Sequence, residues 1–251
     1  MMKRLSFVAL ALTATCAVAT PNANTNKCKD VPSFENLQSA LKTAQAQDNG
    51  GFALNMWGTV VNRDGEVCAV AKTGADRGDQ WPGSRVISAQ KANTANAFSL
   101  PGLALSTANL YSAVQPGGSL FGLQESNPVD TSVAYAGVAS NFGTKTDPLV
   151  GKRIGGINVF GGGLALYNAS GALVGAIGVS GDSSCADHNI AWRTRHTLGL
   201  DNVKAGVAGD KKDNIIFDIA NGKSTSGWGH PTCNDKSSSS NDAVLVASPI
   251  K

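Results

Sequence analysis

The first third of the chain alternates between helical and strand-like spacing of its hydrophobic residues. Apolar positions recur at helical spacing from Phe34 to Ala44, directly after Ser33, whose side chain can cap a helix. Two apolar runs then flank the stretch N-R-D-G at residues 62–65, which is a strong turn signal. This pattern predicts a helix followed by a β-hairpin.

A second helix and a second hairpin are predicted further along the chain. Residues 84–98 are rich in alanine and small polar residues, with Ser84 as the expected cap. Residues 173–179 are almost continuously apolar and follow a turn signal at 168–171. A strand of that kind is buried on both faces, so we expect helices on both sides of the sheet, the last one capped by Asp187.

Two segments give weaker patterns. Residues 101–150 contain a predicted short helix near 107–114 and irregular structure after it. Residues 206–251, which we treat as a C-terminal extension, contain the apolar stretch N-I-I-F-D-I-A at 214–220, a candidate strand. Their serine run at 237–240 is expected to be a flexible loop.

The first residues are typical of an export signal. Lys3 and Arg4 precede a mostly apolar run that ends in A-V-A at residues 17–19, which predicts a signal peptide cleaved after Ala19. A polar segment, residues 20–32, then begins a periplasmic or secreted protein. No later apolar run reaches the roughly 20 residues that a membrane-spanning helix needs, so we expect no membrane span.

The charge of the chain argues against one class of partner. The formal net charge is +3, and removal of Lys3 and Arg4 leaves 19 basic against 18 acidic residues. A nearly neutral chain has no electrostatic basis for binding nucleic acid.

Four cysteines follow the predicted cleavage site, and an even number in an exported chain indicates two disulfides. Three pairings are possible, and we expect Cys28–Cys68 and Cys185–Cys233. Each bond closes a long loop and stabilises the fold by about 4 kcal/mol in the chain-entropy model. A metal site is the weaker alternative, because the sequence contains no C-x-x-C pair.

Other motif-like spacings do not match a recognised chemistry. The glycines of G-A-I-G-V-S-G at residues 175–181 recur every third position, unlike the G-x-G-x-x-G of dinucleotide sites. His188, His196 and His230 have no known metal-ligand spacing. The residues therefore leave catalytic and metal-binding groups unassigned.

Four motifs occur in a distinctive order. They are V-V-N-R-D-G at residues 60–65, K-A-N-T-A at 91–95, G-G-G-L-A at 161–165, and G-A-I-G-V-S-G at 175–181 followed by Asp187. In this order the chain resembles the haem-binding or haem-degrading family of GlcG-like and HbpS-like proteins, related to the C-terminal domain of PduO-type proteins. The similarity covers roughly residues 33–100 and 150–200.

The resemblance implies an α/β (α+β) domain of profilin-like fold over residues 33–205, with an antiparallel sheet and helices on both faces. It also implies a homo-oligomer and a tetrapyrrole ligand, with haem favoured over a corrinoid. Four features depart from the family pattern. The stretch G-L-A at 163–165 replaces a proline-bearing corner, Asn62 stands where the family often has Asp, residues 101–150 form an enlarged insert, and the tail after Leu200 is extra.

The helix with K-A-N-T-A is where the resemblance places the ligand. Lys91 or Arg85 would pair with a haem propionate, and Thr94 would face the iron side of the pocket. A helix of small residues beside a glycine-rich strand leaves room for a flat macrocycle. The alternative is that Thr94 and Ala95 simply pack the helix against the sheet.

These observations favour an exported haem- or tetrapyrrole-binding protein that acts as a carrier, sensor or scavenger. One alternative is an oxidative haem-degrading enzyme, which is less favoured because the sequence shows no catalytic constellation. Another alternative is a ligand-free structural or interaction module of the same fold.

Overall fold

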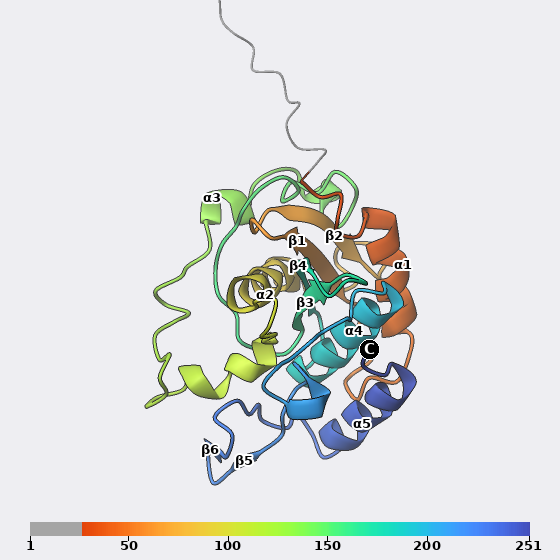
Figure 1. Ribbon diagram of the computed structural model, residues 1–251. Helices are drawn as coiled ribbons and strands as arrows, with labels where there is room; N and C mark the ends of the chain where they lie inside the picture. Colours follow the sequence, from red (N-terminus) through yellow and green to blue (C-terminus); the bar gives the residue numbers. More distant parts are fainter. Residues whose placement is uncertain (1–26) are drawn as a thin grey trace, which may run out of the picture.

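The computed structural model describes residues 27–251, so the predicted signal peptide lies outside the described residues. A four-stranded antiparallel sheet in the order β2-β1-β4-β3 forms its centre (Figure 1). The strands are β1 (Trp57–Asn62), β2 (Val67–Lys72), β3 (Gly163–Tyr167) and β4 (Leu173–Ser180). Both predicted hairpins are present, and they join because β1 of the first pairs with β4 of the second.

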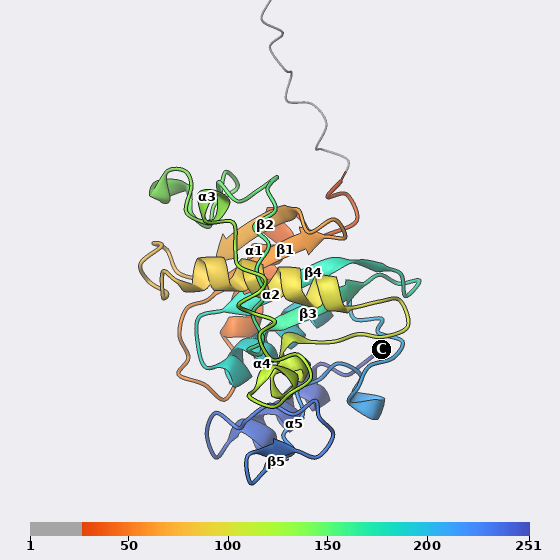
Figure 2. The same cartoon turned by 90° about the vertical axis from the view of Figure 1, so that its left-hand side faces the viewer.

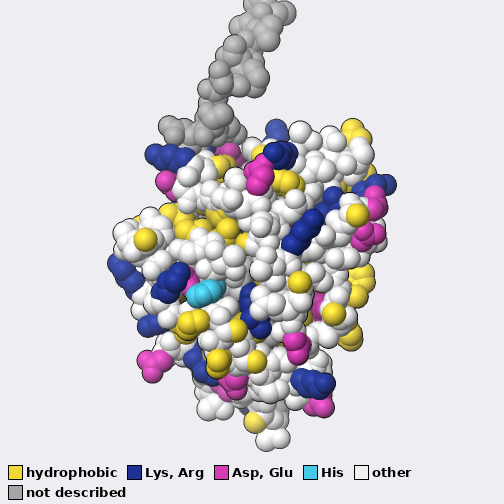
Figure 3. Space-filling model, turned by 90° about the vertical axis from the view of Figure 1, so that its right-hand side faces the viewer, with side chains coloured by type: hydrophobic (Ala, Val, Ile, Leu, Met, Phe, Trp, Pro, Cys, Tyr) yellow, Lys and Arg dark blue, Asp and Glu magenta, His cyan; other side chains and the backbone are white. Residues whose placement is uncertain are grey.

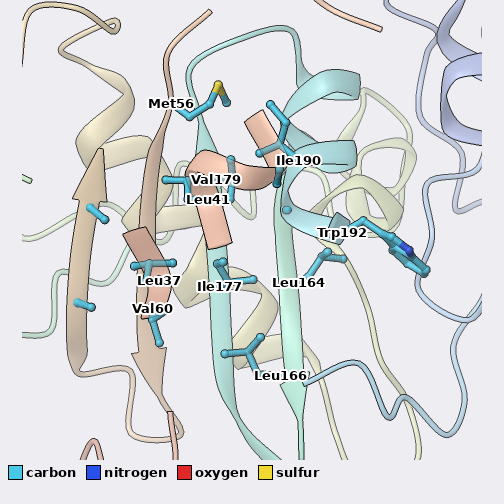
Figure 4. Packing of buried hydrophobic residues seen from close by; sticks show 14 of the residues in the cluster. Leu37, Leu41, Met56, Val60, Leu164, Leu166, Ile177, Val179, Ile190 and Trp192 are labelled. Atoms are coloured by element: carbon cyan, nitrogen blue, oxygen red, sulfur yellow. The ribbon is translucent and has the colours of Figure 1, made fainter. Parts of the chain in front are cut away.

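Helices cover both faces of the sheet, as the sequence predicts. α2 (Ser84–Phe98) crosses one face (Figure 2), whereas α1 (Phe34–Gln45) and α4 (Ser184–Thr197) pack together on the other. Neighbouring residues of β1 divide between these faces, since Val60 packs with α1 and α4 and Val61 packs with α2. Figure 4 shows the core on the α1 and α4 side, which includes Leu37, Leu41, Leu164, Ile177, Val179, Ile190 and Trp192.

Gly178 allows α2 to approach the sheet closely. A Cβ atom at this position would lie 1.9 Å from the carbonyl oxygen of Ser88 and 2.5 Å from the amide nitrogen of Ala92. Both are backbone atoms of α2, so any side chain here would push the helix away from β4. The glycine in this buried strand therefore serves the packing of helix on sheet.

The insert has little regular structure, as expected for residues 101–150. It contains the 3₁₀ turns Thr107–Leu110, Ser112–Val114 and Ala139–Asn141 and the one-turn helix α3 (Thr131–Ala134). The first two turns coincide with the predicted short helix.

The C-terminal extension differs from its prediction in two places. The serine run expected to be a loop forms the first turn of α5 (Ser237–Ala247), because the Ser237 hydroxyl accepts hydrogen bonds from two backbone amides and α5 packs on α4. Only the end of the apolar stretch at 214–220 forms a strand, β5 (Ile219–Ala220), which pairs with β6 (Lys223–Ser224).

Two predicted helix caps are wrong. Ser84 is the first residue of α2, which follows Gly83 and has no side-chain cap. Ser183 caps α4, because its hydroxyl accepts a hydrogen bond from a backbone amide of the first turn. Asp187 therefore lies inside the first turn of α4, where its carboxylate has other partners.

The surface on the side of α1 and α4 carries charges of both signs. Figure 3 shows Lys and Arg side chains interspersed with Asp and Glu side chains there, between small hydrophobic patches. This face has no large field of one sign. In the described part of the chain, no helix combines the length and the apolar character that a membrane span requires.

Candidate functional site

Lys91 lies inside the domain and not at its surface. The residue is 1 % exposed, and its ammonium donates hydrogen bonds to the Asp187 carboxylate at 2.7 Å and to the Val179 carbonyl at 3.1 Å. Burial raises the pKa of Asp187 to about 6, although the charge of Lys91 and its hydrogen bond act in the opposite direction. The charge of Lys91 is thus balanced within the fold, where the pair connects α2 to α4.

Arg85 forms a second buried ion pair. Its guanidinium donates to the two carboxylate oxygens of Asp147, at 2.9 and 2.5 Å, and to the carbonyl oxygen of Ala134 at 3.2 Å. It also lies over the ring of Phe142, 3.7 Å from the ring centre. Asp147 accepts two further hydrogen bonds from backbone amides of the insert. This set of contacts, which we call the Arg85 clamp, fastens the insert to α2.

Thr94 connects α2 to the chain that follows the insert. Its hydroxyl donates to the carbonyl of Gln90 one turn earlier and accepts a hydrogen bond from the amide of Asn158. Beside Gly178, the space that we expected to admit a flat ligand is filled by the backbone of α2. A macrocycle therefore cannot lie between Gly178 and α2.

The structure contains two disulfides, Cys28–Cys68 and Cys185–Cys233, with the pairing that we expected. The first connects the segment before α1 to β2. The second connects the extension to the first turn of α4, where the Cys185 amide donates to the Cys233 sulfur at 3.1 Å. Among residues 27–251, no group of three His, Cys, Asp or Glu side chains is placed to hold a metal ion.

Two of the histidines are buried between α4 and the extension. Nε2 of His188 lies 3.1 Å from both the side-chain oxygen of Asn214 and the amide nitrogen of Ile215. The ring of His230 packs on Tyr111, with ring centres 5.1 Å apart. Burial lowers the pKa of each histidine to about 4, so both rings are neutral at pH 7. His188 thus joins a polar network through Asn214, whereas His230 contacts the Tyr111 ring and the Pro231 carbonyl.

An apolar cavity of about 470 Å³ lies at the N-terminal end of α2. We call it the α2 cavity. Its walls come from the start of β1, the loop before α2, the first turn of α2 and the insert near α3, and they include Trp57, Pro82, Val86, Tyr135, Ala139 and Phe142. Its size lies within the range of about 300–1,000 Å³ that is usual for small-molecule sites.

The Arg85 clamp builds one wall of this cavity. Arg85 itself lines it, and the clamp holds Ala134 and Phe142 on either side of the exposed Tyr135. Lys91 and Thr94 do not line it. Of the three residues that the resemblance placed near a ligand, the structure therefore brings one to the cavity.

Sequence reasoning missed the aromatic residues that the insert contributes. Tyr135 and Phe142 lie in a segment with no hydrophobic period, so no motif marked them. In the structure, two apolar residues of this segment are highly exposed, Tyr135 at 69 % and Val138 at 65 %. Exposed apolar residues that gather in one place often mark a binding site.

A larger cavity of about 630 Å³ lies between the insert and the extension. Small polar residues and glycines form most of its walls, together with Tyr111 and Lys223. A flat apolar ligand would bury less apolar surface there than in the α2 cavity. The α2 cavity is therefore the better candidate for such a ligand.

A sequence profile described as "Haem degrading protein HbpS-like" matches residues 33–195. The chain belongs to the HbpS-like family. The matched HbpS-like region contains the Lys91–Asp187 and Arg85–Asp147 ion pairs and the α2 cavity, whereas Cys233 and α5 lie beyond it. Comparison with curated proteins gave no match.

Three solved structures are similar to this HbpS-like chain at low identity. A "PduOC:Heme Complex" is 22 % identical with a TM-score of 0.46, and the match covers 66 % of this chain and 92 % of that chain. The protein ORFY of Klebsiella pneumoniae is 22 % identical with a TM-score of 0.45, covering 66 % and 90 %. A double mutant of HbpS from Streptomyces reticuli is 19 % identical with a TM-score of 0.42, covering 76 % and 99 %.

Proposed function

We propose that this HbpS-like protein is an exported haem- or tetrapyrrole-binding protein whose ligand occupies the α2 cavity. The family description concerns haem. The observation that carries the proposal is an apolar, aromatic cavity at one end of the helix where the resemblance placed the ligand. A carrier, sensor or scavenger requires this binding and no further chemistry.

The residues that line the α2 cavity fit a haem. Pro82, Tyr135 and the partly exposed Phe142 offer apolar and aromatic surface for a flat macrocycle, whose transfer from water drives binding. Arg77 adds a half-exposed cation that lies 3.5 Å from the exposed Asp76 carboxylate and can turn from this contact to a propionate. A bound haem supplies a redox-active iron.

The three residues named from the sequence have supporting roles in this proposal. Arg85 positions the insert wall through its clamp, because its own charge is already paired with Asp147. Lys91 and Thr94 hold α2 in place from within the fold.

Titration of the chain from residue 20 onward with haemin tests this proposal. We expect a shift of the Soret band at micromolar haemin. Ala139→Trp should weaken binding about tenfold or more, since the added ring fills the cavity from an exposed position. Ala136→Trp is the matched control, because Ala136 is also exposed but does not line the cavity. No Soret shift in the wild type would favour the ligand-free module.

Oxidative haem degradation is the second candidate, because the family description names it. It predicts that the bound haem loses its Soret band and releases iron when a reductant and oxygen are supplied. Ala139→Trp should abolish both effects if they occur in the α2 cavity. A Soret band that persists under these conditions would leave binding alone as the function.

The proposal also includes export and self-association. Cleavage after Ala19 would show as the mass of the protein recovered from the periplasm or medium. Light scattering of that material, with and without haemin, would show whether it forms the homo-oligomer that the resemblance implies.

A further inference from the structure

Tyr135 is the residue of the α2 cavity best suited to bind the iron of a haem. It follows α3 directly and lines the cavity. The residue is 69 % exposed, so its phenol is accessible to a ligand that enters from solvent. Tyrosine is one of the side chains that bind haem iron in proteins.

The common nitrogen and sulfur ligands do not line the described walls of this cavity. His188 is buried against Asn214, His230 is buried against Tyr111, and His196 pairs with Asp201. The four cysteines of the described chain are joined in disulfides. An iron ligand in the α2 cavity is therefore expected to be oxygen.

Two side chains of the lining can provide an anionic oxygen, Asp76 and Tyr135. The Asp76 carboxylate already accepts a hydrogen bond from the Gly78 amide at 2.8 Å and lies 3.5 Å from the Arg77 guanidinium. Tyr135 follows Ala134, whose carbonyl accepts a hydrogen bond from Arg85. The clamp thus fixes the backbone that carries the phenol at the wall of the cavity.

We propose that Tyr135 binds the ferric iron of haem as a phenolate, which makes the site selective for oxidised haem. This inference rests on the proposed function and names the iron ligand of the same site. As the oxygen–iron bond forms, the phenol O–H bond breaks and its proton passes to solvent, and the chloride or water that haemin carries on its iron leaves, so no electron is gained or lost. A phenolate is a hard anionic donor that prefers Fe(III) to Fe(II), and reduction of the iron therefore weakens the bond.

Parallel titrations with haemin and with metal-free protoporphyrin IX separate iron binding from burial of the macrocycle. The wild type should bind haemin about tenfold or more tightly than the porphyrin, whereas Tyr135→Phe should bind the two equally. Tyr111→Phe is the matched control, because Tyr111 lines the other cavity, and it should keep the wild-type preference.

The outcomes distinguish this inference from the proposal on which it rests. If the wild type binds both compounds equally, or if Tyr135→Phe keeps the preference for haemin, the role of Tyr135 is refuted and the proposed function stands. If the wild type binds neither compound, both fail.

Spectroscopy and reduction examine the ligand and the selectivity directly. The wild-type haemin complex should show a ferric phenolate charge-transfer band that Tyr135→Phe lacks. Anaerobic reduction of the iron with dithionite should weaken wild-type binding about tenfold and leave the variant unchanged. Mass spectrometry of the same sample should confirm that the disulfides remain intact. A ferrous complex as tight as the ferric one would refute the selectivity.

Discussion

Helix α2 carries two buried cations that form similar ion pairs but hold different parts of the molecule. Lys91 bonds to Asp187 of α4 and to a carbonyl of β4, so it connects elements of the sheet domain. Arg85 bonds to Asp147 in the insert, 62 residues away in the sequence. Ala134 and Leu149 of the insert also pack in the core between α2 and the sheet, so apolar contacts add to the hold of Arg85. The same kind of interaction therefore maintains the fold in one place and shapes the candidate site in the other.

The largest effect is expected when the Lys91 pair is broken. Lys91→Ala leaves the buried Asp187 carboxylate without its partner, which should lower the free energy of unfolding by about 3–5 kcal/mol. Urea denaturation measures this loss. The double variant Lys91→Met with Asp187→Leu removes both charges and should recover most of the stability. A loss in Lys91→Ala below about 1 kcal/mol would contradict an integral role for the pair.

Lowering the pH should decrease the free energy of unfolding, because His188 and His230 are buried as neutral rings. The pKa values of His188 and His230 fall from 6.5 to about 4 on burial, so the unfolded chain binds their protons first as the pH drops. Each contributes stability that is present above pH 6.5 and is lost towards pH 4, about 3 kcal/mol per histidine. Asp187, whose pKa is raised from 3.8 to about 6, has the opposite effect. Acidification increases its contribution to the free energy of unfolding, because its protonated form is favoured in the folded state.

On acidification the free energy of unfolding should therefore fall by about the contribution of one histidine. Denaturation at pH 7 and pH 4.5 measures it for the wild type and for His230→Gln. The variant should lose less stability on acidification than the wild type. An equal loss in both would contradict the role assigned to His230.

A smaller, local effect is expected when the Arg85 clamp is broken. Arg85→Ala should lower the free energy of unfolding by about 2 kcal/mol, because the Asp147 carboxylate keeps its hydrogen bonds from the amides of Gly143 and Leu149. Hydrogen exchange should speed up at amides between residues 130 and 150 and stay unchanged in β1 and β4. Haemin binding should weaken as the cavity wall is lost.

The matched control for the clamp is Arg153→Ala. Arg153 bonds to the carbonyl of Asp64 from an exposed position, so its removal should cost little stability and leave haemin binding unchanged. Faster exchange throughout the sheet in Arg85→Ala would show that the two ion pairs do not differ in the way proposed.

The difference between local spacing and distant contacts explains how much of the fold could be predicted from the sequence. The strands and helices could be predicted from local spacing, because the apolar residues of α1 and each of the two turn signals lie within a short stretch of sequence. Asp187 shows the limit of local reading. Aspartate is a residue type that often caps helices, yet Asp187 bonds to Lys91, which lies 96 residues away in the sequence. Ser183 caps α4 instead.

The candidate site depends on distant contacts and was only partly predictable. Arg85 was named through the family resemblance, but its clamp to Asp147 could not be read from a segment without periodicity. Tyr135 and Phe142 become cavity residues only after that clamp folds the insert over the end of α2. Spacing along the chain does not contain this information.

The two disulfides set a condition on how the protein has to be produced. Each closes a long loop, with a sequence separation of 40 for Cys28–Cys68 and 48 for Cys185–Cys233, and each is worth about 4 kcal/mol in the chain-entropy model. Expression in a reducing cytosol would leave these four cysteines as thiols, and the free energy of unfolding would be much lower. Free thiols would also bind haem iron themselves and imitate a specific site. Ligand assays are therefore meaningful only on material made in an oxidising compartment.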